Sequence, residues 1–273
     1  MSKSLGNVVD PLDVMTGKDL AAMAKQLEGS GLNSAELDKA REGQRISFPQ
    51  VRIISTFGPG IDRWCLSISS PKDKVFIRFH PNQGIPECGT DALRFGLLAC
   101  DVQSVDISMD VLNIRHHRHF CNKIWQATRF FFHHYNARGF EYHHPVGDRS
   151  VEHRLSEEDV EVLRLYGTMV NDCNTAFEGF RLHHATMAIH NFFWFQLCAV
   201  YLEHTKPFLN NLDSPERDVK LSVLLYCLEG SMRSLHPFMP FLTEELWQRL
   251  KELLPGDGEC DSICLADYPK MNS

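Results

Sequence analysis

From Gly84 to its last residue, the sequence shows one helical pattern after another, punctuated by proline and glycine. Leu163, Tyr166, Val170 and Cys173, for example, recur at the three-to-four spacing that places them on one side of a helix. An amphipathic helix must bury its apolar stripe against another element. A series of such helices with short links therefore predicts a mainly α fold, an antiparallel helix bundle.

The expected helices follow from this spacing and from capping residues. A serine at position 156 with an aspartate three residues later is typical of a helix start. Glu244 and Glu245 are expected at the positive end of the last helix. The expected helices are two short ones within 16–43 around a Gly-Ser-Gly turn, then 91–100, 110–135, one capped by Ser156, 185–206 ending at Pro207, 215–235, and one from Thr243.

Composition limits the classes of function. With 273 residues, 43% of them hydrophobic, the chain can bury one substantial core or two modest ones. No apolar run approaches the roughly 18 residues that span a bilayer, so we expect no membrane partner. The nine cysteines show no metal-binding spacing, which favours reduced thiols in an intracellular protein. The net charge of −7 means that nucleic acid could bind only at a local basic patch.

Such a patch is present in the expected helix over 110–135. Between Arg115 and Arg129, arginine, lysine and histidine alternate with Phe120, Trp125 and Phe130. Cations can contact RNA phosphates while aromatic rings stack on unpaired bases. The alternative is that Trp125 and Phe130 are ordinary core aromatics of a bundle helix.

The chain opens with "MSKSLGN", a lysine flanked by serines. A mobile lysine in a short polar loop suits the stabilisation of a polyphosphate as charge develops on it. The alternative is a solvated tail, because short Ser/Lys/Gly stretches arise freely by chance.

Three stretches in order resemble one family. "MSKSLGN" resembles the KMSKS signature of class I aminoacyl-tRNA synthetases without its first lysine, and "GIPECGTDALRFGL" resembles the segment that follows it in valyl-tRNA synthetases. "RHFCNKIWQATRF" resembles the start of the anticodon-binding domain of those enzymes. The sequence is thus similar to a C-terminal fragment of a valyl-tRNA synthetase, from the KMSKS loop through the anticodon-binding domain.

The resemblance implies a reaction for the parent enzyme, in which ATP and valine are joined to tRNA(Val) with Mg²⁺ accompanying the ATP. Ser2, Lys3 and Ser4 would contact ATP, and Lys3 would be the catalytic residue that neutralises the pyrophosphate leaving group. The nucleotide fold, HIGH signature and editing domain of the family precede this loop and are not in the sequence. We therefore expect that the fragment is inactive alone and that the full-length product is active.

The resemblance also implies contacts with tRNA. Arg118, Asn122, Lys123 and Phe130 would approach the anticodon stem and loop. Asp91 and Arg94 would belong to a junction that holds the bundle against the catalytic half; alternatively they are a helix-start acid and a surface arginine. The sequence departs from the family at Val105 and Asn113, where relatives usually carry arginine, and at Ala199, where an aspartate is frequent. These departures bear on the strength of anticodon binding.

The expected organisation has four parts: 1–50, the KMSKS loop and end of the catalytic domain; 51–83, an atypical insert; 84–110, a junction segment; and 111–273, the anticodon-binding domain. The 33 residues of the insert, from 51 to 83, have no sustained periodicity, and we expect them to be disordered. Their ends can be encoded by the usual edges of an intron. The insert is therefore interpreted as a retained intron, with a genuine surface loop as the alternative.

Other readings of the sequence remain open. His116, His119, His133 and His134 cluster, but neighbours three residues apart supply only two ligands, so we expect no metal site. The chain could instead be a stand-alone tRNA-binding module without catalysis, or a helical scaffold that contacts protein. The expected location is cytoplasmic, with the mitochondrion as the alternative.

Overall fold

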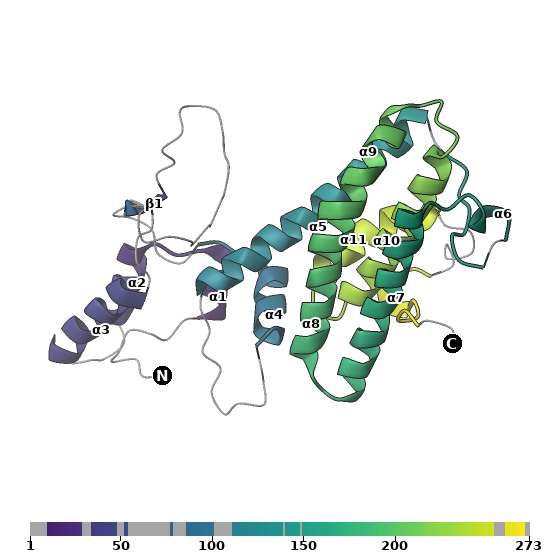
Figure 1. Cartoon of the computed structure of the whole chain (residues 1–273). Helices are drawn as coiled ribbons and strands as arrows, with labels where there is room; N and C mark the ends of the chain where they lie inside the picture. Colours follow the sequence, from purple (N-terminus) through teal and green to yellow (C-terminus); the bar gives the residue numbers. More distant parts are fainter. Residues whose placement is uncertain are drawn as a thin grey trace, which may run out of the picture. The chain divides into compact units, whose positions relative to one another are not determined.

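The computed structural model describes residues 10–28, 34–47, 52–53, 77–78, 86–100, 111–138, 140–147, 149–253 and 260–270. The chain divides into two compact units, residues 1–88 and 89–273, each of which is considered by itself (Figure 1).

The first unit contains three short helices, α1 (Pro11–Thr16), α2 (Leu20–Glu28) and α3 (Ser34–Ser47). The Asp10 carboxylate caps α1 by accepting a hydrogen bond from the Leu12 amide at 2.9 Å. Gly17 follows with φ of 78°, and a Cβ there would lie 2.9 Å from the Glu87 amide nitrogen, so glycine is required. The two helices expected within 16–43 are confirmed, and the second extends to Ser47.

Two segments of the predicted insert pair as short strands. In β1 (Arg52–Ile53) and β2 (Ile77–Arg78), Arg52 is paired with Arg78 and Ile53 with Ile77 in antiparallel register. Isoleucine is β-branched and favours extended backbone. The expectation of disorder for the insert stays a prediction. The rest of 51–83 lies outside the described residues.

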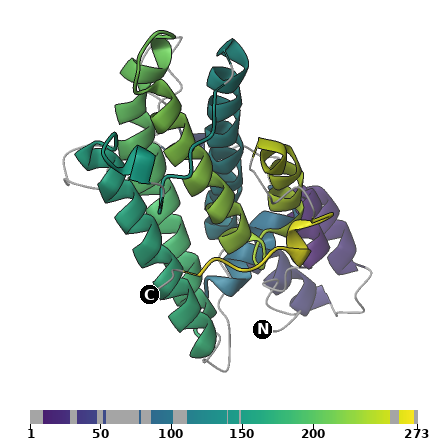
Figure 2. The ribbon, with the colours of Figure 1, turned by 90° about the vertical axis from the view of Figure 1, so that its right-hand side faces the viewer.

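The second unit is an antiparallel helix bundle, as the sequence predicts (Figures 1 and 2). Nearly every residue of α10 is buried, and it packs against helices on several sides, so it is the central helix. Leu221, Leu224 and Leu228 on α10 are fully excluded from solvent. The elements are α4 (Thr90–Leu98), α5 (Val111–Arg138), α6 (Arg149–Glu152), α7 (Glu157–Glu178), α8 (Leu182–Asn191), η2 (Phe192–Tyr201), α9 (Leu202–Asn210), α10 (Arg217–Leu235), α11 (Pro240–Leu250), η3 (Lys251–Leu253) and η5 (Ile263–Leu265).

The start of α7 confirms the predicted cap. The Ser156 hydroxyl accepts a hydrogen bond from the Asp159 amide at 3.4 Å, and the Asp159 carboxylate accepts one from the Ser156 amide at 2.9 Å. This reciprocal pair satisfies two amides that the helix itself leaves without acceptors.

One continuous helical rod runs from Leu182 to Asn210, and its middle part, η2, is a π-helix. The expected end at Pro207 is wrong, because Pro207 lies inside α9. A proline removes one backbone hydrogen bond from a helix. Leu209, beyond it, is fully buried, so the packing of α9 offsets that loss.

The expected start of α11 at Thr243 is also wrong, since the helix begins at Pro240. Proline suits the first turn of a helix, where its missing N–H would have no intrahelical acceptor. Glu244 and Glu245 consequently lie beyond the first turn. The negative charge at this helix start comes instead from Asp91 of α4, which accepts hydrogen bonds from the Phe241 and Leu242 amides at 3.3 and 2.7 Å.

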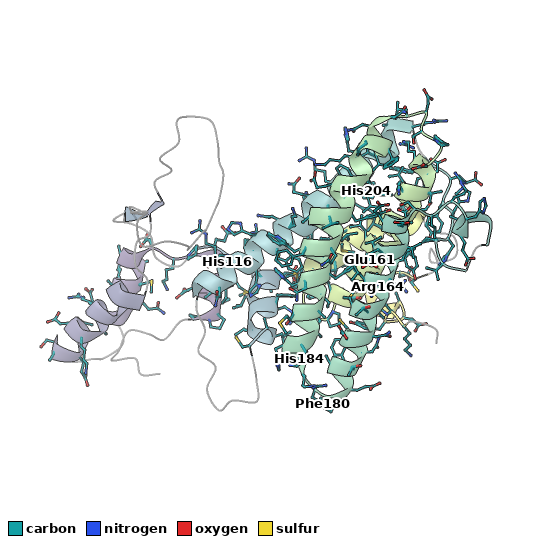
Figure 3. The ribbon with its side chains drawn as sticks, viewed as in Figure 1. His116, Glu161, Arg164, Phe180, His184 and His204 are labelled. Carbon is teal, nitrogen blue, oxygen red and sulfur yellow. The ribbon has the colours of Figure 1, made fainter. Side chains whose placement is uncertain are left out.

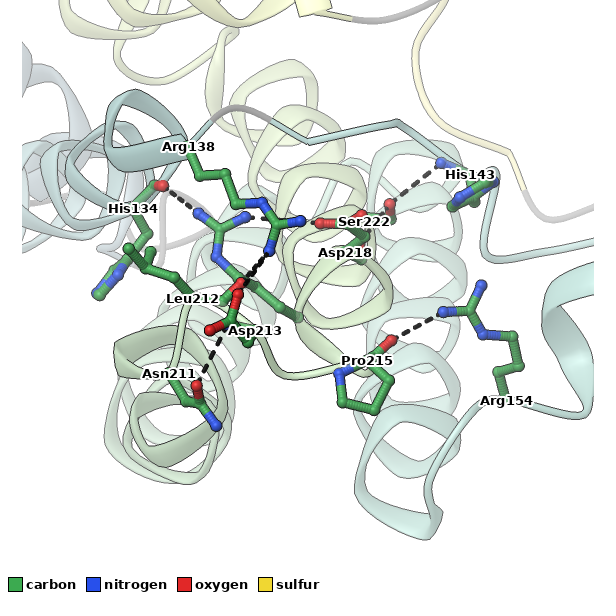
Figure 4. Close-up of polar contacts among 11 residues, drawn as sticks. His134, Arg138, His143, Arg154, Asn211, Leu212, Asp213, Pro215, Asp218 and Ser222 are labelled. Atoms are coloured by element: carbon green, nitrogen blue, oxygen red, sulfur yellow. Dashed lines mark hydrogen bonds and ion pairs between the residues drawn. The ribbon is translucent and has the colours of Figure 1, made fainter.

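Polar contacts fasten the segment between α9 and α10 to its surroundings (Figure 4). Arg138, in the last turn of α5, donates to the Leu212 carbonyl, and Arg154 donates to the Pro215 carbonyl at 2.9 Å. The His143 amide donates to the Ser222 hydroxyl at 3.1 Å. The connection is therefore held by α5 and by the chain between α5 and α7. None of the helices in the described part of the chain is both long and apolar enough to cross a membrane.

Candidate nucleic-acid interface

Helix α5 concentrates positive charge in a chain of net charge −7. Its 28 residues include no aspartate or glutamate. Among the described residues, no carboxylate lies within ion-pair distance of Arg118, Lys123 or Arg129. These side chains can therefore meet phosphate groups without first breaking an internal ion pair.

Arg118 and Asn122, two of the predicted tRNA contacts, lie together at one side of α5. With Trp125 they line a cavity of about 500 Å³ between α4, α5 and α11, which Phe241 and Glu245 close from α11. The guanidinium can bind phosphate, while the Asn122 amide and the Glu245 carboxylate can hydrogen-bond to base edges. The cavity thus combines a cation, hydrogen-bonding groups and an aromatic ring, and the Asp91 carboxylate also lines it.

Trp125 gives this cavity an aromatic wall. Its side chain is 38% exposed, and the Arg249 guanidinium lies 5.8 Å from the ring centroid. Arg249 is ion-paired with Glu245, one turn earlier on α11. A guanidinium on the ring holds it in place by a cation–π interaction. The alternative of an ordinary core aromatic does not describe Trp125, because more than a third of it is exposed.

Lys123 and Phe130, the other two predicted contacts, lie away from this cavity. The Lys123 ammonium is 5.6 Å from the Trp194 ring centroid, and Trp194 is stacked on His190 at 5.6 Å and 21°. Phe130 is half-buried and packs edge-on against His134, with ring centroids 4.6 Å apart. The structure therefore divides the four predicted residues between two sides of α5.

Sequence reasoning missed Trp194, His190 and Arg249. Trp194 lies in the apolar run "FFWFQLCAVYL", where it looks like a core residue, and it is half-buried beside Lys123. Its distance along the chain from Lys123 leaves no local signal. A cation–π pair between two helices can be recognised only when the three-dimensional arrangement of the helices is known.

Two histidines of this region, His119 and His190, have pKa values below the usual range of histidine. Burial, with the nearby Arg115 and His116 charges, lowers the pKa of His119. Burial also lowers the pKa of His190.

His116 projects from α5 in Figure 3. Among the described residues, no group of three or more histidine, cysteine, aspartate or glutamate side chains could hold a metal ion.

Asp91 and Arg94 tie α4 to the turn between α10 and α11. Besides the Asp91 contacts above, the Arg94 guanidinium donates to the Pro237 carbonyl at 3.1 Å. Burial raises the pKa of Asp91, although the two backbone hydrogen bonds oppose that rise. Their predicted role against a catalytic half stays a prediction.

Several predicted positions lie outside the described residues. They are Ser2, Lys3, Ser4 and Val105. Of the other departures from the family pattern, Asn113 is exposed in the first turn of α5 and Ala199 is exposed on η2.

Part of the bundle is similar to a known domain family. The family model described as the anticodon-binding domain of tRNA ligases matches residues 159–273. The matched range of the anticodon-binding domain begins in the first turn of α7 and leaves α5 outside it. The predicted boundary at 111 therefore stays a prediction.

Curated valine–tRNA ligases match nearly all of the chain. The rat protein is 39% identical over 99% of this chain and 18% of its own length. The human protein is 38% identical over the same shares, and the mitochondrial protein of Sus scrofa is 36% identical over 100% of this chain and 22% of its own. The chain thus spans about a fifth of the length of the curated relatives it matches.

A solved structure also resembles the chain. It is a ternary complex of the Agrobacterium radiobacter K84 agnB2 LeuRS with tRNA and LeuAMS. The similarity has 20% identity and a TM-score of 0.47, and it covers 68% of this chain and 20% of that one.

Proposed function

We propose that this chain is a tRNA-binding part of a valine–tRNA ligase and that α5 is its main contact with the tRNA. The observation that carries the proposal is that Arg118, Lys123 and Arg129 of α5 have no carboxylate within ion-pair distance among the described residues, while Trp125 and Trp194 lie beside the helix. The anticodon-binding domain model and the valine–tRNA ligases that match the chain support the same conclusion.

Binding would use the two sides of α5 differently. On one side, Arg118 engages a phosphate while a base enters the cavity and stacks on Trp125. On the other side, Lys123 binds a phosphate of the tRNA backbone next to Trp194. The phosphate contacts supply affinity, and Asn122 and Glu245 supply base discrimination.

Salt dependence tests this proposal directly. Binding of valine tRNA to the purified chain is measured at several salt concentrations, and log affinity should fall linearly with log salt. The variant Arg118→Gln/Lys123→Gln/Arg129→Gln should reduce the slope by about two to three, since each phosphate contact contributes about 0.7 to 0.9.

The control removes the same number of charges elsewhere. Arg164→Gln/Lys206→Gln/Lys270→Gln alters Arg164, which is paired with Glu161 on α7 (Figure 3), Lys206, which is paired with Glu203, and Lys270 near the C-terminus. Equal slopes for the two triple variants would contradict the assignment of α5. A chain that binds no tRNA at low salt would support the helical scaffold instead.

For catalysis, we propose the reaction of the parent family, in which valine is activated by ATP with Mg²⁺ and joined to tRNA(Val). Lys3 would stabilise the departing pyrophosphate between Ser2 and Ser4, a proposal supported by the resemblance of "MSKS" and by the relatives. Pyrophosphate exchange distinguishes this role from a non-catalytic module. The chain alone should give no exchange, and a longer protein that contains it should give exchange that Lys3→Ala reduces.

A further inference from the structure

A cysteine, a histidine and a threonine that do not line the cavity beside α5 are aligned in the second unit. His236 follows α10, Thr243 is on α11 and Cys264 is in η5. The Nε2 atom of His236 lies 2.9 Å from the Cys264 sulfur, and its Nδ1 atom lies 2.8 Å from the Thr243 hydroxyl oxygen.

The hydrogen bonds of Thr243 favour one tautomer of His236. The buried Thr243 hydroxyl lies within donor distance of the Met239 carbonyl at 2.8 Å and the Pro240 carbonyl at 3.4 Å. When it donates its single proton to either carbonyl, it accepts from His236, and Nδ1 then carries the ring proton. In the neutral imidazole, Nε2 is then an unprotonated acceptor that faces the thiol.

The position of Cys264 is fixed by α11. The Glu244 carboxylate accepts hydrogen bonds from the Ser262 hydroxyl at 2.8 Å and the Ile263 amide at 3.2 Å. Ser262 in turn caps η5 by accepting from the Cys264 amide at 3.2 Å. These contacts hold the thiol against the imidazole on a turn anchored to the bundle.

Accessibility separates Cys264 from the other thiols. Cys264 is the exposed one among the cysteines of the described residues. Burial raises the pKa of Cys121, Cys173 and Cys198 to about 12, so these thiols stay protonated and unreactive. Cys260, half-buried and a few residues away, provides a nearby comparison.

We propose that Cys264 is a nucleophilic thiol, with His236 as its base and Thr243 as the residue that orients the base, and that it is modified by small-molecule disulfides. His236 Nε2 takes the thiol proton, and the thiolate attacks one sulfur of the disulfide. A new S–S bond forms to Cys264 as the old one breaks. The departing thiolate recovers the proton from the imidazolium, so atoms, charge and electrons balance.

The surroundings of His236 suit this role. Burial lowers its pKa and keeps the ring neutral at rest, and the Arg94 charge acts in the same direction. The Glu244 and Asp91 carboxylates act in the opposite direction and would stabilise the imidazolium once it forms. The base is thus available at neutral pH and has carboxylates near its charged form.

The test measures the rate at which each cysteine reacts with 2,2′-dithiodipyridine at pH 7, followed by peptide mass spectrometry. Native Cys264 should react about tenfold faster than the same cysteine in the urea-unfolded chain, because a fixed base accelerates thiolate formation. His236→Gln should abolish this ratio, and Thr243→Val should reduce it by freeing the tautomer. Cys260 should keep its rate in both variants.

Circular dichroism establishes that each variant is folded. If His236→Gln does not fold, Thr243→Val carries the same comparison, and the native-to-unfolded ratio of the unaltered chain stands without any variant. A ratio of one or less would show a merely exposed thiol and overturn the proposal. A high ratio that survives His236→Gln in a folded chain would overturn the assignment of the base.

Discussion

The ammonium of Lys220 lies 2.8 Å from a carboxylate oxygen of Asp159, and the two side chains are only 1% and 0% exposed. The other carboxylate oxygen accepts a hydrogen bond from the Tyr201 hydroxyl at 2.7 Å. Lys220 also donates to the Ser156 hydroxyl at 2.7 Å. A single buried cluster therefore joins the start of α7 to η2 and α10.

Removing one member of this buried pair should be costly. Lys220→Met leaves the Asp159 carboxylate without its cation and should lower the free energy of unfolding by about 3–5 kcal/mol. Asp159→Asn should have a comparable effect, and the double variant should lose much less than the sum. Urea denaturation of the four proteins measures this coupling. Strict additivity of the two effects would show that the pair is not coupled. As a control, Glu161→Gln changes an exposed carboxylate and should leave the urea midpoint unchanged.

Gly230→Ala in α10 should destabilise the bundle, although alanine in a helix is normally more stable than glycine by about 1 kcal/mol. A Cβ at position 230 would lie 1.9 Å from the Tyr166 hydroxyl oxygen and 2.6 Å from its Cζ. Tyr166 is buried, so its ring cannot move aside freely. Overpacking of this kind costs about 1–3 kcal/mol, occasionally more.

Thermal unfolding measures the effect of Gly230→Ala on the melting temperature. A second glycine, Gly179, provides the comparison. Gly179→Ala brings its Cβ near the Arg181 side chain, which is exposed and can shift. Its melting temperature should change little. A rise in the melting temperature of Gly230→Ala would contradict the contact with Tyr166.

Stability should fall as the pH is lowered from about 6.5 to 4. Burial, with the charges of His190 and His116, lowers the pKa of His117 from 6.5 to about 4. In this window the unfolded chain takes up a proton that the folded chain does not, so protonation favours unfolding. Above pH 6.5 both states are neutral at this residue, and its effect disappears.

Urea denaturation between pH 7.5 and 4 measures this dependence. His117→Gln should flatten it but not remove it, because His119, His134, His190 and His236 also have lowered pKa values, in each case chiefly through burial. An unchanged pH dependence in His117→Gln would rule out its contribution.

Trp125→Leu and Trp194→Leu should each weaken binding of an anticodon-loop hairpin, because base stacking on an aromatic contributes about 1–3 kcal/mol per base. The expected loss is about five- to 150-fold in affinity, with little change in the salt slope. Fluorescence anisotropy with a labelled hairpin provides the measurement. Phe180→Leu is the matched control, since Phe180 is 82% exposed at the turn between α7 and α8 (Figure 3). A loss as large in Phe180→Leu would exclude specific stacking.

Much of the bundle could be predicted from the sequence because its helices are marked locally. Ser156 and Asp159 are close enough in sequence for their capping pair to be recognised, and the stripe through Tyr166 and Val170 lies on a buried face. The basic character of α5 was equally plain, since it depends only on composition.

The features that the sequence predicted wrongly or missed depend on residues that are far apart in the chain. Pro207 is tolerated because α9 is packed on the core, and α11 begins early because Asp91 supplies acceptors from α4. The site beside α5 combines Trp125 with Arg249, and Lys123 with Trp194, from helices far apart in the chain. Such pairs leave no trace in periodicity.

The π-helical segment Phe192–Tyr201 affects how length variation in this protein should be understood. A helix bonded from each residue to the fifth one along accommodates extra residues within the same rod. A homologue with one residue fewer here could therefore keep Trp194 and Leu209 on their present sides by tightening to ordinary α-helical bonding. Gaps that an alignment opens at this point would then record a change in helical winding instead of a shortened surface loop.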